Sequence, residues 1–132
     1  MIALDSNVLI RLLIEDDPVQ AELARRLIEF AQEQGERCFI GDPVLCEVEW
    51  VLDSAYGASR RDVATALQNI ISSPSFVFDD AASIQSALDR FWRGKADFSD
   101  YLLGTRARKR GTGTTYTFDK ALRDEEGFTL LT

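Results

Sequence analysis

The sequence predicts a three-layer α/β/α sandwich with about five mostly parallel strands. Short apolar runs alternate along the 132 residues with segments whose apolar residues recur at helical spacing. The apolar runs do not alternate polar with apolar residues, which is typical of parallel strands covered by helices on both faces. The length suits one domain, so we expect a single domain over residues 1–132.

Five short apolar runs are the expected strands. In order they are residues 1–4, 37–40, 76–78, 114–118 and 128–131. Helical periodicity follows the first run through Val8, Leu9, Leu12 and Leu13. The second expected helix carries Leu23, Leu27, Ile28 and Ala31 at helical spacing, and the fourth carries Val63, Ala66, Leu67 and Ile70.

Capping residues indicate where the expected helices begin. Asp17-Pro18 and Asp42-Pro43 each place a cap before a proline at the first helical position. Ser59 is expected to cap the fourth helix, Asp79 or Asp80 the fifth, and Ser99 to open the sixth. We expect ends near Gly35 for the second helix, Tyr56 for the third, Trp92 for the fifth and Gly111 for the sixth.

The composition excludes several kinds of chemistry. There is no histidine, which rules out Ser-His-Asp and Cys-His hydrolysis and imidazole-ligated zinc. Cys38 and Cys46 are too few for a disulfide scaffold and are expected to be small buried hydrophobic residues, which suits a reducing cytoplasm. The start MIALDSNVLI lacks the features of a signal peptide, and no apolar run is long enough for a membrane helix. We therefore expect a soluble cytoplasmic protein with no membrane partner.

Charge is distributed unevenly along the chain. The net charge is −7, but residues 90–123 hold nine basic and three acidic residues, a net charge of +6, and the rest carries −13. Such asymmetry is a known indication of contact with a polyanion. The candidate contact residues are Arg106, Arg108, Lys109 and Arg110. The alternative is a solvated helix face followed by a loop.

Carboxylates are the remaining candidates for chemistry. Asp5 and Asp119 directly follow expected strands, where open α/β sheets form their sites, although Asp5 could equally cap the next helix. Glu47 and Glu49 lie at opposite edges of the third helix's apolar stripe, so helical geometry does not choose between them. Capping explains Asp79 and Asp80 adequately.

Asp97 and Asp100 lie three residues apart at the start of the basic helix. Asp100 is expected to share a face with Leu103, Gly104 and Ala107, and the small residues would allow this face to approach the sheet closely. Capping explains part of its placement. Clustered carboxylates without histidine suit Mg²⁺ or Mn²⁺. Such a site would suit phosphoryl chemistry, with the basic stretch holding a phosphate backbone.

Four segments together resemble the PIN-domain ribonucleases, specifically the VapC toxins of toxin–antitoxin pairs. The segments are LDSNVLIRLLIEDDP, DPVLCEVEWVL, DFSDYLLGTRARKRG and TYTFDKAL, and they cover essentially the whole chain. The resemblance implies that Asp5, Glu47, Asp100 and Asp119 form the catalytic quartet that binds Mg²⁺ or Mn²⁺. It thereby favours Glu47 over Glu49.

The resemblance also assigns supporting roles. Asp97 would assist the site through water or as an outer group, Ser6 would keep a polar contact there, and Asn7 would hydrogen-bond a neighbouring carboxylate. The family implies metal-dependent cleavage of single-stranded RNA, a homodimer, and a small antitoxin laid across the acidic site. The expected contact surface, with core packing as its alternative, comprises Leu12, Leu13, Leu27, Phe30 and Trp50. Arg11 is expected to be a surface or interface charge.

Three other functions fit the sequence less well. A haloacid-dehalogenase-like phosphatase needs a second aspartate two residues after the first, where this chain has Asn7. A phospho-receiver domain needs an adjacent acidic pair after its first strand, which is missing. A PIN-fold scaffold that no longer cleaves RNA would not require the four acids.

Overall fold

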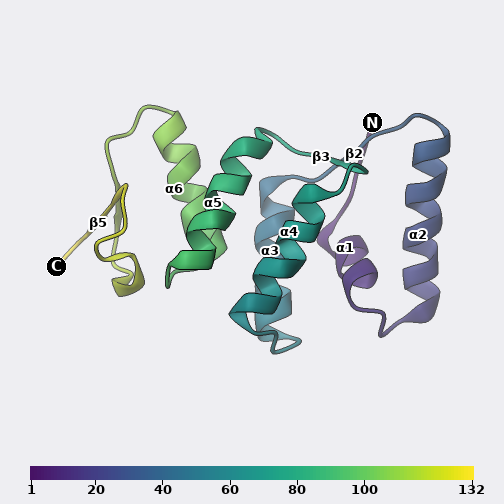
Figure 1. Cartoon of the computed structure of the whole chain (residues 1–132), viewed down its shortest axis with the longest axis horizontal. Helices are drawn as coiled ribbons and strands as arrows, with labels where there is room; N and C mark the ends of the chain where they lie inside the picture. Colours follow the sequence, from purple (N-terminus) through teal and green to yellow (C-terminus); the bar gives the residue numbers. More distant parts are fainter. The chain divides into compact units, whose positions relative to one another are not determined.

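The computed structural model describes all 132 residues as two compact units, Met1–Ala81 and Ala82–Thr132 (Figure 1). We call them the N-terminal and C-terminal units. Five strands are present and all of them pair in parallel, which confirms the predicted α/β class. They belong to two sheets, three strands in the N-terminal unit and two in the C-terminal unit.

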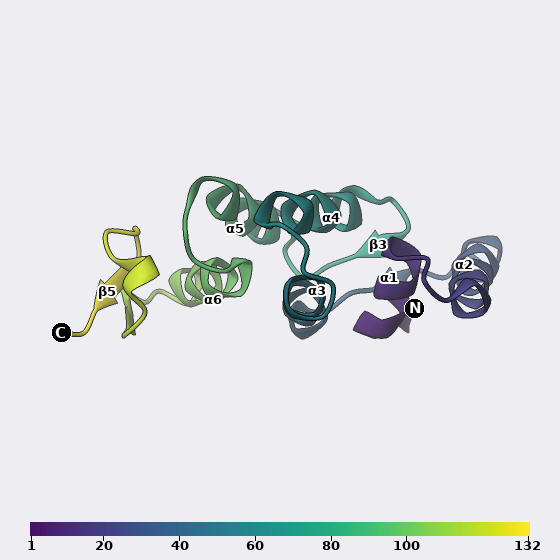
Figure 2. The same ribbon diagram turned by 90° about the horizontal axis from the view of Figure 1, so that it is seen from below.

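The N-terminal unit is built from three two-residue strands and four helices. Its elements are β1 (Ile2–Ala3), α1 (Ser6–Leu13), α2 (Pro18–Glu33), β2 (Cys38–Phe39), α3 (Asp42–Ser54), α4 (Arg60–Ser72) and β3 (Phe76–Val77). The strands lie in the order β1-β2-β3, with Ala3, Phe39 and Val77 in register. Helix α1 contacts α2 and α3, and α3 lies beside α4 (Figure 2).

Of the caps predicted for α2, α3 and α4, two are correct. The Asp17 side chain accepts a hydrogen bond from the Gln20 N–H at 3.0 Å, and Ser59 caps α4 through the Asp62 N–H at 3.1 Å. The prediction for Asp42 was wrong, because Gly41 is the N-cap and Asp42 lies in the first turn of α3. Aspartate there still benefits from the positive end of the helix dipole.

Small residues form the buried face of α2. Ala21, Ala24 and Ala31 are buried, whereas Leu23 is 60% exposed and Phe30 equally so. The stripe through Leu23 and Leu27 is therefore not the core-facing stripe of this helix. Alanine leaves little bulk between two helices, so the face that carries it can lie closest to α1. Leu23 and Phe30, two of the larger apolar residues of α2, are left towards the solvent.

The C-terminal unit contains two helices and a two-stranded sheet. Its elements are α5 (Ala81–Arg93), which begins at the last residue of the preceding unit, α6 (Phe98–Lys109), β4 (Thr115–Thr117), the 3₁₀ helix η1 (Lys120–Leu122) and β5 (Phe128–Leu130). Phe91 of α5 meets Phe98 of α6 edge to face, with ring centroids 6.5 Å apart. Strands β4 and β5 pair in parallel, with Thr115 opposite Phe128.

Helix α6 begins one residue earlier than predicted, at Phe98, and Asp97 is its N-cap. Its buried face includes Phe98, Tyr101, Leu102 and Gly104, so the expectation that Leu103 shares the docking face was wrong. Gly104 does provide the expected close approach, because a Cβ there would lie 2.5 Å from the Phe128 ring of β5. No helix of the chain has both the length and the hydropathy needed to cross a bilayer.

Candidate carboxylate site

Asp5 begins α1 and also gathers polar groups at the end of β1. Its Oδ1 accepts hydrogen bonds from the Ser6 N–H at 2.7 Å and from the Ser6 hydroxyl at 3.3 Å. The Asn7 amide donates to Oδ2 at 3.4 Å, which confirms the predicted contact of Asn7 with a neighbouring carboxylate. Asp5 therefore caps α1, as its position after the first strand suggested, and its exposed carboxylate remains accessible to a ligand.

The structure distinguishes the two glutamates of α3 by their burial. Glu49 is only 7% exposed, whereas Glu47 is exposed on the surface of the helix. A ligand from solvent can reach Glu47 without rearrangement of the core. This difference agrees with the choice that the resemblance made and that periodicity left open.

Three acids of the C-terminal unit influence one another. Asp100 is half-buried, and its Oδ2 accepts a hydrogen bond from the Asp97 N–H at 3.1 Å. Burial raises the pKa of Asp100, and the negative charges of Asp97 and Asp119 raise it further, against the opposing effect of the Asp97 N–H. Asp119 is the N-cap of η1 and accepts from the Ala121 N–H at 2.9 Å. The ionised form of Asp100 is thus disfavoured without a nearby cation.

The chemistry of these acids fits a hard divalent cation. Within each unit, no three His, Cys, Asp or Glu side chains lie close enough together to hold a metal ion. Oxygen donors are nevertheless what Mg²⁺ and Mn²⁺ prefer, and a cation would relieve the repulsion that Asp100 experiences.

The basic residues at the end of α6 are unequally accessible. Arg108 forms an ion pair with Glu126 at 2.8 Å, and this contact lowers the pKa of Glu126. Lys109 and Arg110 are exposed, and Arg106 is half-buried. A polyanion that bound here would therefore compete with Glu126 for Arg108.

Arg11 is part of a polar cluster rather than an isolated surface charge. Its Nε donates to Gln20 at 2.7 Å, and its Nη1 contacts Asp16 at 3.0 Å and the Tyr56 hydroxyl at 3.4 Å. The Tyr56 hydroxyl in turn donates to Asp16 at 3.0 Å. Hydrogen bonding to Tyr56 raises the pKa of the Arg11 guanidinium. The cluster joins α1 to the start of α2 and to the chain after α3.

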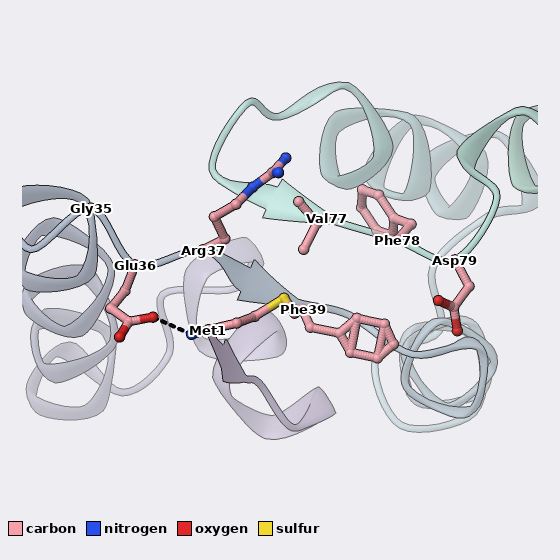
Figure 3. Close-up of a pocket in the computed structure, with 8 residues that line it drawn as sticks. All are labelled: Met1, Gly35, Glu36, Arg37, Phe39, Val77, Phe78 and Asp79. Carbon is pink, nitrogen blue, oxygen red and sulfur yellow. Dashed lines mark ion pairs between the residues drawn. The ribbon is translucent and has the colours of Figure 1, made fainter.

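Two hollows of the N-terminal unit were not predicted as pockets from the sequence. A cavity of about 440 Å³ lies against the β2 and β3 strands, where the Met1 ammonium pairs with Glu36 (Figure 3). Its lining residues are Met1, Gly35, Glu36, Arg37, Phe39, Val77, Phe78 and Asp79, none of them in the predicted quartet. A groove of about 250 Å³ between α1 and α2 includes Asn7, Arg11, Leu23 and Leu27.

Comparison with known proteins identifies the family. The family model of the PIN domain matches residues 2–126, a span that runs through both units and includes all four predicted acids. The chain belongs to the PIN domain family. The chain is also similar to the VapC ribonuclease of Aquifex aeolicus (strain VF5), to which it is 23% identical over 120 residues, which cover 91% of this chain and 88% of that protein. No solved structure matches the chain.

Proposed function

We propose that this PIN-domain protein is a metal-dependent endoribonuclease and the toxin of a toxin–antitoxin pair. The observation that carries the proposal is the PIN-domain match over residues 2–126, which spans Asp5, Glu47, Asp100 and Asp119 in a chain without histidine. The family match, and the similarity to a protein named VapC ribonuclease, support ribonuclease chemistry. The match also runs continuously across the two units, which supports one domain over residues 1–132.

In this proposal Asp5, Glu47, Asp100 and Asp119 hold Mg²⁺ or Mn²⁺. The bound ion would supply activation of a water molecule and stabilisation of the leaving oxygen during phosphodiester hydrolysis. Asp5 contributes from a rigid position, because the α1 backbone and Asn7 hold its two oxygens. Asp97 holds the start of α6 and acts on Asp100 through its backbone N–H.

Arg106, Arg108, Lys109 and Arg110 would bind the RNA backbone. Phosphate contacts of this kind give affinity without sequence preference and weaken as salt rises. The exposure of Lys109 and Arg110 supports this role. Arg108 would exchange Glu126 for a phosphate, since a surface ion pair contributes little and is easily replaced.

Partners would cover the exposed apolar side chains of the early helices. We propose a homodimer and a small antitoxin that lies across the acidic site, both in the cytoplasm. Of the expected contact residues, Phe30 and Trp50 are 60% and 66% exposed, whereas Leu12 and Leu13 are half-buried. The α1–α2 groove supports an antitoxin contact, because it contains both Leu27 and Asn7, the neighbour of Asp5.

The test is cleavage of labelled single-stranded and structured RNA by the purified protein with Mg²⁺, Mn²⁺ or EDTA. Glu47→Gln and Asp100→Asn should abolish cleavage. Asp53→Asn is the matched control for the first, because Asp53 is another exposed acid of α3. Asp89→Asn, on α5, is the control for the second. Metal-dependent cleavage lost only in the first two variants supports the proposal.

The opposite results have distinct meanings. A protein that binds Mn²⁺ but cleaves none of the RNAs would favour a PIN-fold scaffold without catalytic activity. A protein that binds no divalent ion would overturn the metal site itself. Equal loss of cleavage in Asp53→Asn would show that the effect is one of overall charge rather than of the four acids.

A further inference from the structure

The buried hydroxyl of Tyr101 connects two segments that carry proposed catalytic acids. It accepts a hydrogen bond from the Ala96 N–H at 3.4 Å and donates one to Glu125 at 3.0 Å. Ala96 directly precedes Asp97, and Glu125 follows the 3₁₀ helix that Asp119 begins. We propose that Tyr101 is a positioning residue that fixes Asp100 and Asp119 relative to one another, an inference that rests on the proposed function.

A hydroxyl is suited to this role because it can accept and donate a hydrogen bond at the same time. Tyr101 is fully buried, so water cannot substitute for either partner without a change in packing. A phenylalanine would keep the ring but lose both contacts.

The surroundings of Tyr101 hold its ring and hydroxyl in one position. Gly94 has no side chain where a Cβ would overlap the Tyr101 hydroxyl. The Arg90 guanidinium lies 5.1 Å from the centre of the Tyr101 ring and 3.5 Å from the Glu125 carboxylate. Arg90 also donates to the Glu126 carbonyl at 2.7 Å. The tyrosine is thus enclosed by α5, the α5–α6 turn and the chain before β5.

The two segments joined by Tyr101 carry two of the proposed metal ligands, Asp100 on α6 and Asp119 at the start of η1. These ligands keep one spacing only if other contacts hold the segments together. Tyr101 supplies such a contact with one atom. Groups that orient metal ligands in this way commonly change metal affinity by about 10–100-fold when they are removed.

The test compares Tyr101→Phe with Thr105→Val in the full chain. Thr105 lies one turn further along α6, and its hydroxyl donates only to the Tyr101 carbonyl at 2.7 Å, so its loss leaves the connection to Glu125 intact. Three experiments are made on each variant: Mn²⁺ affinity by electron paramagnetic resonance, steady-state kinetics of RNA cleavage for kcat and KM, and amide hydrogen exchange of residues 94–102 and 119–126.

We expect Tyr101→Phe to weaken Mn²⁺ binding by about tenfold. It should lower kcat with little change in KM, and speed exchange in both segments together. Thr105→Val should match the wild type in Mn²⁺ affinity and kcat. Glu125→Gln retains an oxygen that accepts the Tyr101 hydrogen bond and should keep most of the affinity, whereas Glu125→Ala should resemble Tyr101→Phe. The double variant Tyr101→Phe/Glu125→Ala should be no worse than either single variant, because both remove one connection.

Three outcomes would overturn the proposal. Unchanged Mn²⁺ affinity in a Tyr101→Phe variant that merely melts earlier would show an ordinary structural role. An equal loss in Thr105→Val would show a general weakening of α6. A wild-type protein that binds no Mn²⁺ would overturn the proposed function and this inference together. This failure is distinguishable from failure of the inference alone, because it appears in the wild type without any variant.

Discussion

Replacement of Asp5 by alanine and by asparagine separates its two roles. The Asp5 carboxylate begins α1 through the 2.7 Å bond from the Ser6 N–H, and in our proposal it also binds metal. Asparagine caps helices as well as aspartate does, although it carries no charge, whereas alanine neither caps a helix nor carries a charge. The two variants therefore share the loss of the charge and differ in the loss of the cap.

The expected magnitudes follow from the exposure of Asp5 and the short length of α1. Loss of the cap in Asp5→Ala should lower the free energy of unfolding by about 1–2 kcal/mol. Asp5→Asn loses only the exposed charge–dipole interaction, about 0.5 kcal/mol. For a chain of this size, 1 kcal/mol corresponds to about 3–4 °C in Tm. Cleavage should fall in both variants by at least about a hundredfold, the scale of removing one charge-stabilising group.

The assay combines melting by circular dichroism with RNA cleavage. Melting is measured in EDTA, because a bound ion would add its own stabilisation. Asp17 provides the control, since it caps α2 with a 3.0 Å bond from the Gln20 N–H and is not among the proposed ligands. Asp17→Ala should lower Tm like Asp5→Ala and leave cleavage unchanged.

Two results would refute this reasoning. If Asp5→Asn cleaves RNA as the wild type does, Asp5 is a cap and not a metal ligand. If Asp5→Asn melts as early as Asp5→Ala in EDTA, the stabilising contribution of Asp5 comes from its charge and the capping argument is wrong.

Three further predictions concern the C-terminal unit. Gly104→Ala should lower stability by about 1–3 kcal/mol because its Cβ would overlap the Phe128 ring; Gly113→Ala, where nothing lies within 4 Å, should not, and calorimetry compares the two. Glu126→Gln should strengthen RNA binding, because it releases Arg108 from its ion pair, and Arg108→Glu should weaken binding, because it removes that positive charge. The affinity of Glu126→Gln for RNA should fall more steeply with salt than that of Arg108→Glu. Equal salt slopes for the two variants would contradict this. The ion pair with Arg108 lowers the pKa of Glu126. The contribution of this pair to stability is therefore complete above the ordinary carboxyl pKa and is lost as the pH falls through the lowered pKa of Glu126. Carboxyl chemical shifts in a pH titration would report this pKa.

Local features of the fold were predictable from the sequence. Asp17 and Ser59 cap helices because each side chain bonds a backbone N–H three residues along, an interaction that needs no other part of the chain. The start of α3 was misplaced by one residue, since glycine and aspartate are both acceptable caps. The buried face of α2 was not predictable, because apolar residues lie on several of its faces and contact with α1 decides among them.

The candidate site likewise combines local contacts, which were predictable, with tertiary contacts, which were not. The contacts of Asp5 with Ser6 and Asn7 lie within three residues, and the resemblance to PIN-domain ribonucleases implied a polar role for both residues. The different burial of Glu47 and Glu49 depends on tertiary packing, so spacing alone could not choose between them. The Tyr101 hydroxyl was missed because its partner Glu125 is 24 residues away, beyond any local pattern.

Several acids of the proposed site also begin helices, so few of them can be substituted without an effect on the fold. Asp5 and Asp119 are N-caps, and Asp100 accepts the N–H of the cap residue of α6. A change of side-chain length at any of these three acids would disturb a helix start as well as a proposed metal ligand. Glu47 lies on the exposed surface of α3, away from its first turn. An engineer who wished to alter the proposed metal site would therefore begin at Glu47, where a shorter or neutral side chain leaves every helix start intact.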